Sequence, residues 1–177
     1  MKVGHVVVSE LPPPAMPDKG EGREAEKAFE AVFDETLEWA MVAVAADEGS
    51  IEDALRRFVD VDECSLVITT GGIGPSEHAI TPDATLAVIV RELPGLAEAM
   101  RAAAFRLAPE SVLSRAVAGI RANTLILNLP SKTQQVARIA TCLAPAIAEC
   151  IEQITSCRPK LKAGLGSEGI EPPTYWV

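Results

Sequence analysis

Aromatic residues and long hydrophobic runs are both scarce in this sequence. Only 4% of the 177 residues are aromatic although 48% are hydrophobic, so the core has to be built mainly from alanine, valine, leucine and isoleucine. No run reaches the roughly eighteen apolar residues that a membrane-spanning helix needs, which argues against a membrane span. The first ten residues also lack a basic flank followed by a long hydrophobic region. We therefore expect no signal peptide and a cytoplasmic protein.

Positive charge is also in short supply. There are 16 lysines and arginines against 25 aspartates and glutamates, which gives a formal net charge of −9. A surface that binds nucleic acid has to neutralise phosphates with basic side chains, so nucleic acid is not expected as a partner. The overall charge still allows a local basic pocket for one small anionic ligand.

Closely spaced cysteine pairs are missing as well. None of the four cysteines stands in a C-x-x-C pair, and three of them fall on one late helical stretch and its end. A zinc site is therefore not expected. Buried or idle thiols in a reducing compartment are the simpler interpretation.

Strand-like and helix-like patterns alternate along the chain, which is long enough for one domain with a sizeable core. The predicted strands are residues 2–9, 39–46, 65–70, 116–120 and 124–130. The predicted helices are residues 23–38, 51–59, 81–93, 96–107 and 132–154. A proline-rich loop over residues 11–22 separates the first strand from the first helix. We expect one α/β domain over residues 1–157 and an extended C-terminal tail over residues 158–177.

Three features within the helices lead to specific expectations. Ser50 and Thr81 are predicted N-caps, and Pro82 follows at the first helical position, where its missing N–H is tolerated. Pro145 is expected to kink or divide the last helix. An apolar stripe in the helix over residues 81–93 is expected to face the core; its members are Leu86, Ile89, Val90 and Leu93.

The order of these elements predicts the fold class. Alternating strands and helices indicate a single three-layer α/β/α domain with a mainly parallel sheet. In such sheets ligands bind outside the carboxyl ends of the strands. Four polar loops are expected there: those that follow Ser9, Ala46 and Ile68, and the end of the strand over residues 124–130.

The most distinctive stretch is the glycine-rich loop in TTGGIGPSEHAITPDAT, residues 69–85. Gly71, Gly72 and Gly74 let a ligand approach the main chain closely, and exposed N–H groups just before a helix favour a phosphate or another anion. The loop matches neither G-x-x-x-x-G-K-[ST] nor G-x-G-x-x-G. Taken alone, it could also be a tight turn with no ligand.

Further motifs give the loop a context. LVITTGGIGP and ITPDAT are followed by RELPGL at residues 91–96, AMR at 99–101, LSR at 113–115 and LILNLP at 125–130. Asp47-Glu48 and Asp18-Lys19-Gly20 also fit. In this order the motifs resemble the molybdenum cofactor biosynthesis family, and among its members the molybdopterin adenylyltransferases. The resemblance is dense over residues 47–130 and thin elsewhere.

This resemblance implies a molybdopterin-binding type of three-layer α/β/α fold, commonly assembled as a homotrimer. It implies a pocket for molybdopterin, a pterin that carries a dithiolene and a terminal phosphate. The implied reaction transfers AMP from ATP, with Mg²⁺, to that phosphate. Molybdopterin and Mg-ATP are therefore the expected ligands, and the sequence does not distinguish a molybdenum from a tungsten pathway.

The residues predicted to form the site lie at the ends of the strands. Attack of one phosphate on another requires charge neutralisation, positioning and a metal. Asp47 is the predicted catalytic and metal-binding carboxylate, with a turn or capping role as the alternative. Thr70 and the glycine-loop amides are expected to hold the phosphate. The predicted substrate-binding residues are Ser9, Thr70, Gly71, Gly72, Gly74, Pro75, Ser114, Asn128, Pro130 and Ser131.

The sequence departs from the family pattern at three positions. Ala79 replaces the aspartate of Arg-Asp-x-Thr-Pro, Leu11 stands where a basic residue is usual, and Ser131 stands where glycine is usual. Alanine can neither bind a metal nor accept a proton, so altered chemistry is expected. Glu77 and Asp83 are the predicted substitute catalytic carboxylates. A solvated loop charge for Glu77 and a helix-dipole contact for Asp83 are the alternatives.

Several basic residues have simpler interpretations. His78 could contact a phosphate in place of the usual arginine, but a surface role is the simpler interpretation. Arg91 and Arg101 are interpreted as solvated helix charges or salt-bridge partners, and His5 as a core or edge residue.

Three functions remain open from the sequence. The first is an adenylyltransferase that has moved its metal ligand. The second is a catalytically impaired molybdopterin-binding or carrier paralogue. The third is a structural paralogue in which the glycine loop serves only the fold.

Overall fold

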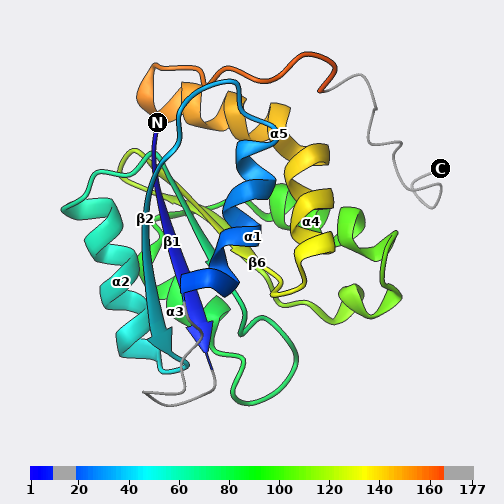
Figure 1. Ribbon diagram of the computed structural model, residues 1–177. Coiled ribbons are helices and arrows are strands. Elements are labelled where there is room, and N and C mark those ends of the chain that lie inside the picture. Colours follow the sequence, from blue (N-terminus) through cyan, green and yellow to red (C-terminus); the bar gives the residue numbers. More distant parts are fainter. Residues whose placement is uncertain (10–18, 166–177) are drawn as a thin grey trace.

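A six-stranded sheet with helices on both faces forms the fold, and the structure, a computed structural model, describes residues 1–9 and 19–165 (Figure 1). The strands are β1 (Lys2–Ser9), β2 (Glu38–Ala45), β3 (Leu66–Thr70), β4 (Arg91–Glu92), β5 (Ala118–Arg121) and β6 (Thr124–Leu129). The helices are α1 (Lys19–Glu30), α2 (Glu48–Asp60), α3 (Thr81–Val88), α4 (Pro94–Phe105), the 3-10 helix η1 (Pro109–Leu113) and α5 (Thr133–Thr155).

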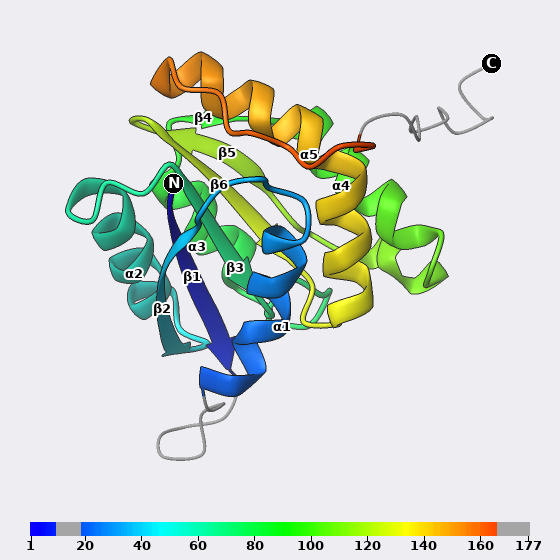
Figure 2. The same cartoon turned by 45° about the horizontal axis from the view of Figure 1, so that its top comes forward.

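The sheet is parallel through its centre and antiparallel at one edge. Its strand order is β2-β1-β3-β6-β5-β4, and the pairs β1–β2, β1–β3 and β3–β6 are parallel (Figure 2). β5 and β6 form an antiparallel hairpin, and the short β4 pairs antiparallel with β5. The prediction of an α/β fold with a mainly parallel sheet is confirmed.

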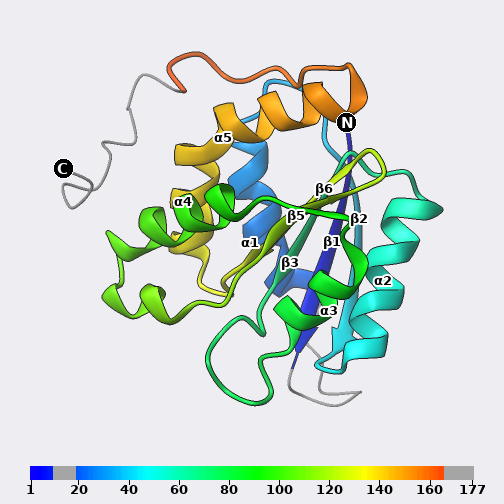
Figure 3. The same ribbon diagram turned by 180° about the vertical axis from the view of Figure 1, so that it is seen from behind.

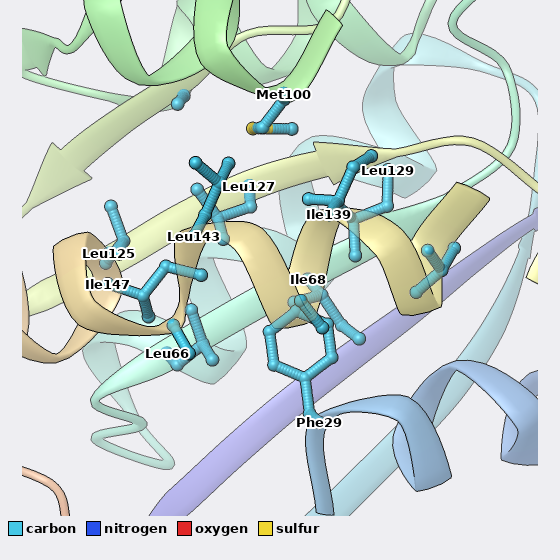
Figure 4. Packing of buried hydrophobic residues seen from close by; sticks show 14 of the residues in the cluster. Phe29, Leu66, Ile68, Met100, Leu125, Leu127, Leu129, Ile139, Leu143 and Ile147 are labelled. Atoms are coloured by element: carbon cyan, nitrogen blue, oxygen red, sulfur yellow. The ribbon is translucent and has the colours of Figure 1, made fainter. Parts of the chain in front are cut away.

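Two apolar clusters fill the spaces between the sheet and its helices. One cluster joins α1, α4 and α5 to the sheet, and Figure 4 shows Phe29, Met100 and Ile139 among its buried side chains. The other joins α2 and α3 to the opposite face, where Leu55 and Val67 are buried; Figure 3 brings these two helices to the front. Loops, rather than the helical layers, lie at the carboxyl ends of the central strands.

The first helix is shorter than predicted. It ends at Glu30, and the chain then turns, with Val32 N–H donating to the Phe29 carbonyl at 3.0 Å. Phe33 forms an isolated antiparallel bridge with Leu161. The apolar spacing after residue 30 therefore reflects burial in a turn, which periodicity alone does not distinguish from helix.

The cap of α2 is also different from the prediction. Asp47, not Ser50, is the N-cap: its backbone is extended (φ −127°, ψ 146°), and its Oδ1 accepts a hydrogen bond from Ser50 N–H at 2.8 Å. Ser50 thus lies in the first turn. Because aspartate and serine are both good N-caps, the sequence allowed either position.

The helix α3 stops five residues before its predicted end because the chain joins the sheet. Val90 N–H donates to the Ile120 carbonyl and Leu93 N–H to the Ala118 carbonyl, both at 2.8 Å. As a result, the expected core stripe is wrong in part: Leu86 is 47% exposed and Val90 is 73% exposed. The predicted N-cap Thr81 is instead the first residue of α3, and α5 continues through Pro145 without interruption.

The start of the predicted tail packs on the body of the domain. Residues 158–165 run beside the turn after α1, where Asp34 N–H donates to the Lys160 carbonyl at 2.7 Å. Residues 10–18 of the predicted proline-rich loop and residues 166–177 lie outside the described residues. Within the part that is described, no helix has the length and apolar character needed to cross a membrane.

Candidate functional site

A cavity of about 360 Å³ lies outside the carboxyl ends of β3 and β6. The glycine loop forms one wall, which we call the loop wall (residues 71–76 and 79). Side chains of α4, η1 and the start of α5 form the opposite wall, which we call the helical wall (Met100, Arg101, Ala104, Ser111, Gln135 and Ile139). Both the position and the size are typical of a small-molecule site in an open α/β sheet.

The glycine loop has a backbone that other residues could not adopt without strain. Gly71 has φ +94° and Gly72 has φ +65°. A Cβ at Gly71 would lie 2.7 Å from the Val8 carbonyl oxygen, and one at Gly72 would collide with Thr81 Oγ1. Gly74 has a different role, because a Cβ there would meet nothing within 4 Å and would project into open space.

Two neighbouring segments hold the loop in place. The hydroxyl of Thr81 donates to the Gly71 carbonyl at 3.0 Å, and its N–H donates to the Gly72 carbonyl at 3.1 Å. Gly71 N–H is itself bonded to the Leu129 carbonyl at 3.2 Å. The loop is therefore tied to both α3 and β6.

Arg115 joins the loop to the helix that follows it. Its backbone N–H donates to the Ile73 carbonyl at 2.8 Å, and its guanidinium donates to the Ala79 carbonyl at 3.1 Å. The same guanidinium contacts both carboxylate oxygens of Asp83, at 2.6 and 2.9 Å. Asp83 is thus engaged in a two-point ion pair, and a metal could recruit it only by displacing Arg115.

Thr70 faces away from the cavity toward a buried histidine. His5 Nε2 lies 2.9 Å from Thr70 Oγ1, and His5 Nδ1 lies 3.4 Å from Glu26 Oε1. Burial lowers the pKa of His5 to about 4, so the ring is neutral near pH 7, and burial also raises the pKa of Glu26. Thr70 and Ser9 are both buried and neither lines the cavity.

The carboxylates predicted to act in catalysis do not gather at the cavity. Asp47 caps α2, and the hydrogen bonds from Ser50 lower the pKa of its carboxyl group. Glu77 is 88% exposed, with Oε1 3.6 Å from His78 Nε2. Among the described residues, no group of three or more histidine, cysteine, aspartate or glutamate side chains could hold a metal ion.

Ala79 stands at the position where the family resemblance implies an aspartate. It is 2% exposed and lines the cavity, so a carboxylate at this position would point into or beside the site. In this chain that part of the wall is a methyl group with no charge.

The predicted hydrogen-bonding residues Ser114 and Asn128 line the cavity. Ser114 Oγ accepts from Ala116 N–H at 3.2 Å. Asn128 is fully buried; its amide donates to Thr69 Oγ1 at 3.1 Å and to Thr85 Oγ1 at 2.8 Å, and its Oδ1 accepts from Val117 N–H at 3.1 Å. The predicted residues that the cavity brings together are Gly71, Gly72, Gly74, Pro75, Ser114, Asn128, Pro130 and Ser131.

The helical wall contains polar residues that the sequence did not single out as ligand-binding. Arg101, expected to be a solvated or ion-paired helix charge, is half-buried and lines the cavity. Gln135 is 6% exposed and donates to Ser111 Oγ at 3.2 Å. Lys132 forms an ion pair with Glu110, with Nζ 2.9 Å from Oε1, and both residues line the cavity. No short motif joins these residues, because they lie on three elements of the fold.

Comparison with known proteins places the chain in a family. Residues 25–149 match the family described as "Probable molybdopterin binding domain". A molybdopterin adenylyltransferase of Helicobacter pylori (strain J99) is 39% identical over 132 residues, which cover 72% of this chain and 75% of the relative. The Escherichia coli (strain K12) molybdopterin adenylyltransferase is 47% identical over 90 residues, which cover 51% of this chain and 46% of the relative.

Solved structures agree with this assignment. The molybdopterin biosynthesis enzyme MoaB of Thermus thermophilus has a TM-score of 0.79 and 30% identity, with coverage of 90% of this chain and 99% of that one. A MogA structure has a TM-score of 0.73 and 32% identity, with coverage of 87% and 99%. The chain therefore belongs to the molybdopterin-binding domain family, among proteins of molybdenum cofactor biosynthesis.

Proposed function

We propose that this protein binds molybdopterin in the cavity and transfers AMP from Mg-ATP to the terminal phosphate of the pterin. The observation that carries the proposal is the cavity itself, which combines a glycine loop with polar side chains outside β3 and β6. Relatives named molybdopterin adenylyltransferase support the same reaction.

The loop wall suits the phosphate end of such a ligand. Gly74 leaves open space beside the main chain, where N–H groups close to the start of α3 can approach an anion. Arg101, which has no carboxylate within salt-bridge distance in the described chain, supplies a positive charge to the cavity, whereas the charge of Lys132 is balanced by Glu110. In a protein of net charge −9, this local arrangement is what would attract an anionic ligand.

Catalysis also requires carboxylates that can bind Mg²⁺. Mg²⁺ would arrive with ATP, and Asp47 is the described carboxylate that matches the family position. The family aspartate is replaced by Ala79, and Asp83 is bound to Arg115. These two observations favour a second candidate, a molybdopterin-binding or carrier paralogue with impaired turnover.

An adenylylation assay separates the two candidates. Purified protein is mixed with molybdopterin and Mg-ATP, and adenylylated pterin and pyrophosphate are followed. We expect wild-type turnover that falls about a hundredfold in Asp47→Asn, because this change removes the charge. Asparagine is an equally good N-cap, so α2 should remain folded.

The Ala79→Asp variant supplies the second arm of this assay. If wild type binds the pterin without turnover and Ala79→Asp gains it, the protein is a binding paralogue. If wild type binds no molybdopterin, the proposed function is wrong.

We further propose a homotrimer, in keeping with the family resemblance. Phe105, Val112 and Leu113 are large apolar side chains that are 47%, 65% and 57% exposed on α4 and η1, two elements that pack together. Exposed apolar surface of this kind is common at protein interfaces. Light scattering of the purified protein measures the assembly directly, and a monomer would contradict the proposal.

A further inference from the structure

The helical wall carries a hydrogen-bond acceptor that no described residue satisfies. Gln135 uses its amide N–H to bond Ser111 Oγ, and no donor in residues 1–9 or 19–165 contacts its Oε1. No side-chain nitrogen or oxygen in those ranges is buried without a partner, so Oε1 is accessible to solvent. Because Gln135 is only 6% exposed and lines the cavity, this oxygen opens into the cavity.

Arg101 brings unused donors to the same wall. One guanidinium N–H bonds the Ala116 carbonyl at 2.9 Å. No carboxylate of the described chain lies within salt-bridge distance of Arg101. By contrast, Arg115 pairs with Asp83 and Arg121 pairs with Asp60. A half-buried guanidinium without a carboxylate partner retains donors for a ligand oxygen.

Three other members of the helical wall are apolar. Met100 and Ala104 come from α4 and Ile139 from α5, and Figure 4 shows Met100 on the side of α5 that carries Ile139. Met100 precedes Arg101 directly, and Ile139 lies one helical turn after Gln135. An apolar lining with a few polar atoms suits a ligand of the same character, such as a heteroaromatic ring with polar atoms at its edge.

We propose that the helical wall recognises the ring of the ligand, with Arg101 donating to a ring carbonyl and Gln135 Oε1 accepting from an adjacent ring N–H. This donor–acceptor pattern is complementary to the lactam edge of a 4-oxopteridine. A 2,4-diaminopteridine presents the opposite pattern, with an amino donor in place of the carbonyl and a bare ring nitrogen in place of the N–H. The inference rests on the proposed function and assigns specificity-determining residues within it.

The test measures the binding of two pteridines by the whole protein. The fluorescence of 2-amino-4-oxopteridine and 2,4-diaminopteridine is titrated with protein at neutral pH, where both rings are largely uncharged. A polar site that is left unpaired rejects the mismatched ligand, so wild type should prefer the 4-oxo ring by about tenfold or more. The ratio of the two affinities is compared within each variant, so it does not depend on the folded fraction.

Matched variants assign the preference to the two side chains. Gln135→Leu and Arg101→Met should reduce the ratio to near one, whereas Gln135→Glu and Arg101→Lys, which keep an acceptor and a donor, should retain part of it. Gln134→Leu and Arg138→Met are the controls, because these neighbours lie on α5 outside the cavity lining. They should keep the wild-type ratio.

Four results would overturn the inference, and three of them concern the ratio of affinities. They are equal wild-type affinities for the two rings, a ratio that survives in Gln135→Leu and Arg101→Met, or a ratio lost equally in the controls. Binding of neither ring would also overturn it. If molybdopterin is still adenylylated in any of these cases, the proposed function stands and only the assignment of the helical wall fails.

Discussion

The two walls of the cavity are built by different means. The loop wall is mainly backbone, fixed by the positive φ angles of Gly71 and Gly72 and by hydrogen bonds to Thr81 and Arg115. The helical wall is made of side chains on α4, η1 and α5 that pack on an apolar core. The stability of the loop wall should therefore depend on single atoms. In the helical wall, changes in side-chain size should be tolerated by the fold and should weaken only ligand recognition.

The strongest test of this difference removes the buried amide behind the loop wall. Asn128→Ala leaves Val117 N–H without its acceptor. It also removes the amide that donates to the hydroxyl oxygens of Thr69 and Thr85. We expect the free energy of unfolding to fall by about 3–4 kcal/mol. Ile139→Val, in the helical wall, should cost only about 0.5–1.5 kcal/mol. Urea denaturation of both variants makes the comparison, and equal losses would contradict it.

Acid titration tests the buried histidine that backs the same wall. The pKa of His5 falls from 6.5 to about 4 on folding, so the unfolded chain binds more protons between these values. Stability is then fully present above pH 6.5 and should decrease by about 3 kcal/mol as the pH falls to about 4. The raised pKa of Glu26 opposes this effect in part.

The His5→Gln variant isolates the histidine contribution. Its free energy of unfolding, measured by urea denaturation across the same pH range, should vary less than that of wild type. Identical pH profiles for the two proteins would show that His5 does not titrate with the shifted pKa.

A smaller effect separates two glycines of one loop. Gly72→Ala places a Cβ against Thr81 Oγ1 at a positive φ, and we expect a loss of about 2 kcal/mol in unfolding free energy. Gly74→Ala is the matched control; its Cβ meets open space, so the change should stay within about 0.5 kcal/mol. A similar loss in both would mean that the open space beside Gly74 is not available.

The loop wall could be predicted from the sequence because its determinants are contiguous. Three glycines and Thr81-Pro82 fall within residues 71–82, directly after a strand of the predicted parallel sheet. The strand and helix order was predictable for the same reason, since periodicity is a local property. Helix ends were less predictable: α3 stops where residues 90–93 bond to β5, a partner almost thirty residues later in the chain.

The helical wall could not be assembled from the sequence. Arg101 and Gln135 are 34 positions apart, and each resembles an ordinary helix surface residue in its own segment. Thr70 illustrates the opposite case, because its motif suggests a ligand contact but its hydroxyl lies beside His5. In both cases the direction of a side chain depends on packing between elements, which no local pattern specifies.

The contact between residues 158–165 and the turn after α1 has a practical consequence for labelling. The segment after α1 lies beside the start of β1, where the Met1 amino group pairs with Glu35, and this end of the strands is opposite the end that carries the glycine loop (Figure 1). Because β1 is eight residues long, these two ends of the sheet are about 25 Å apart. A surface tether attached at exposed Lys160 or Lys162 would therefore leave the cavity mouth uncovered, so that ligand binding can be measured on the immobilised protein.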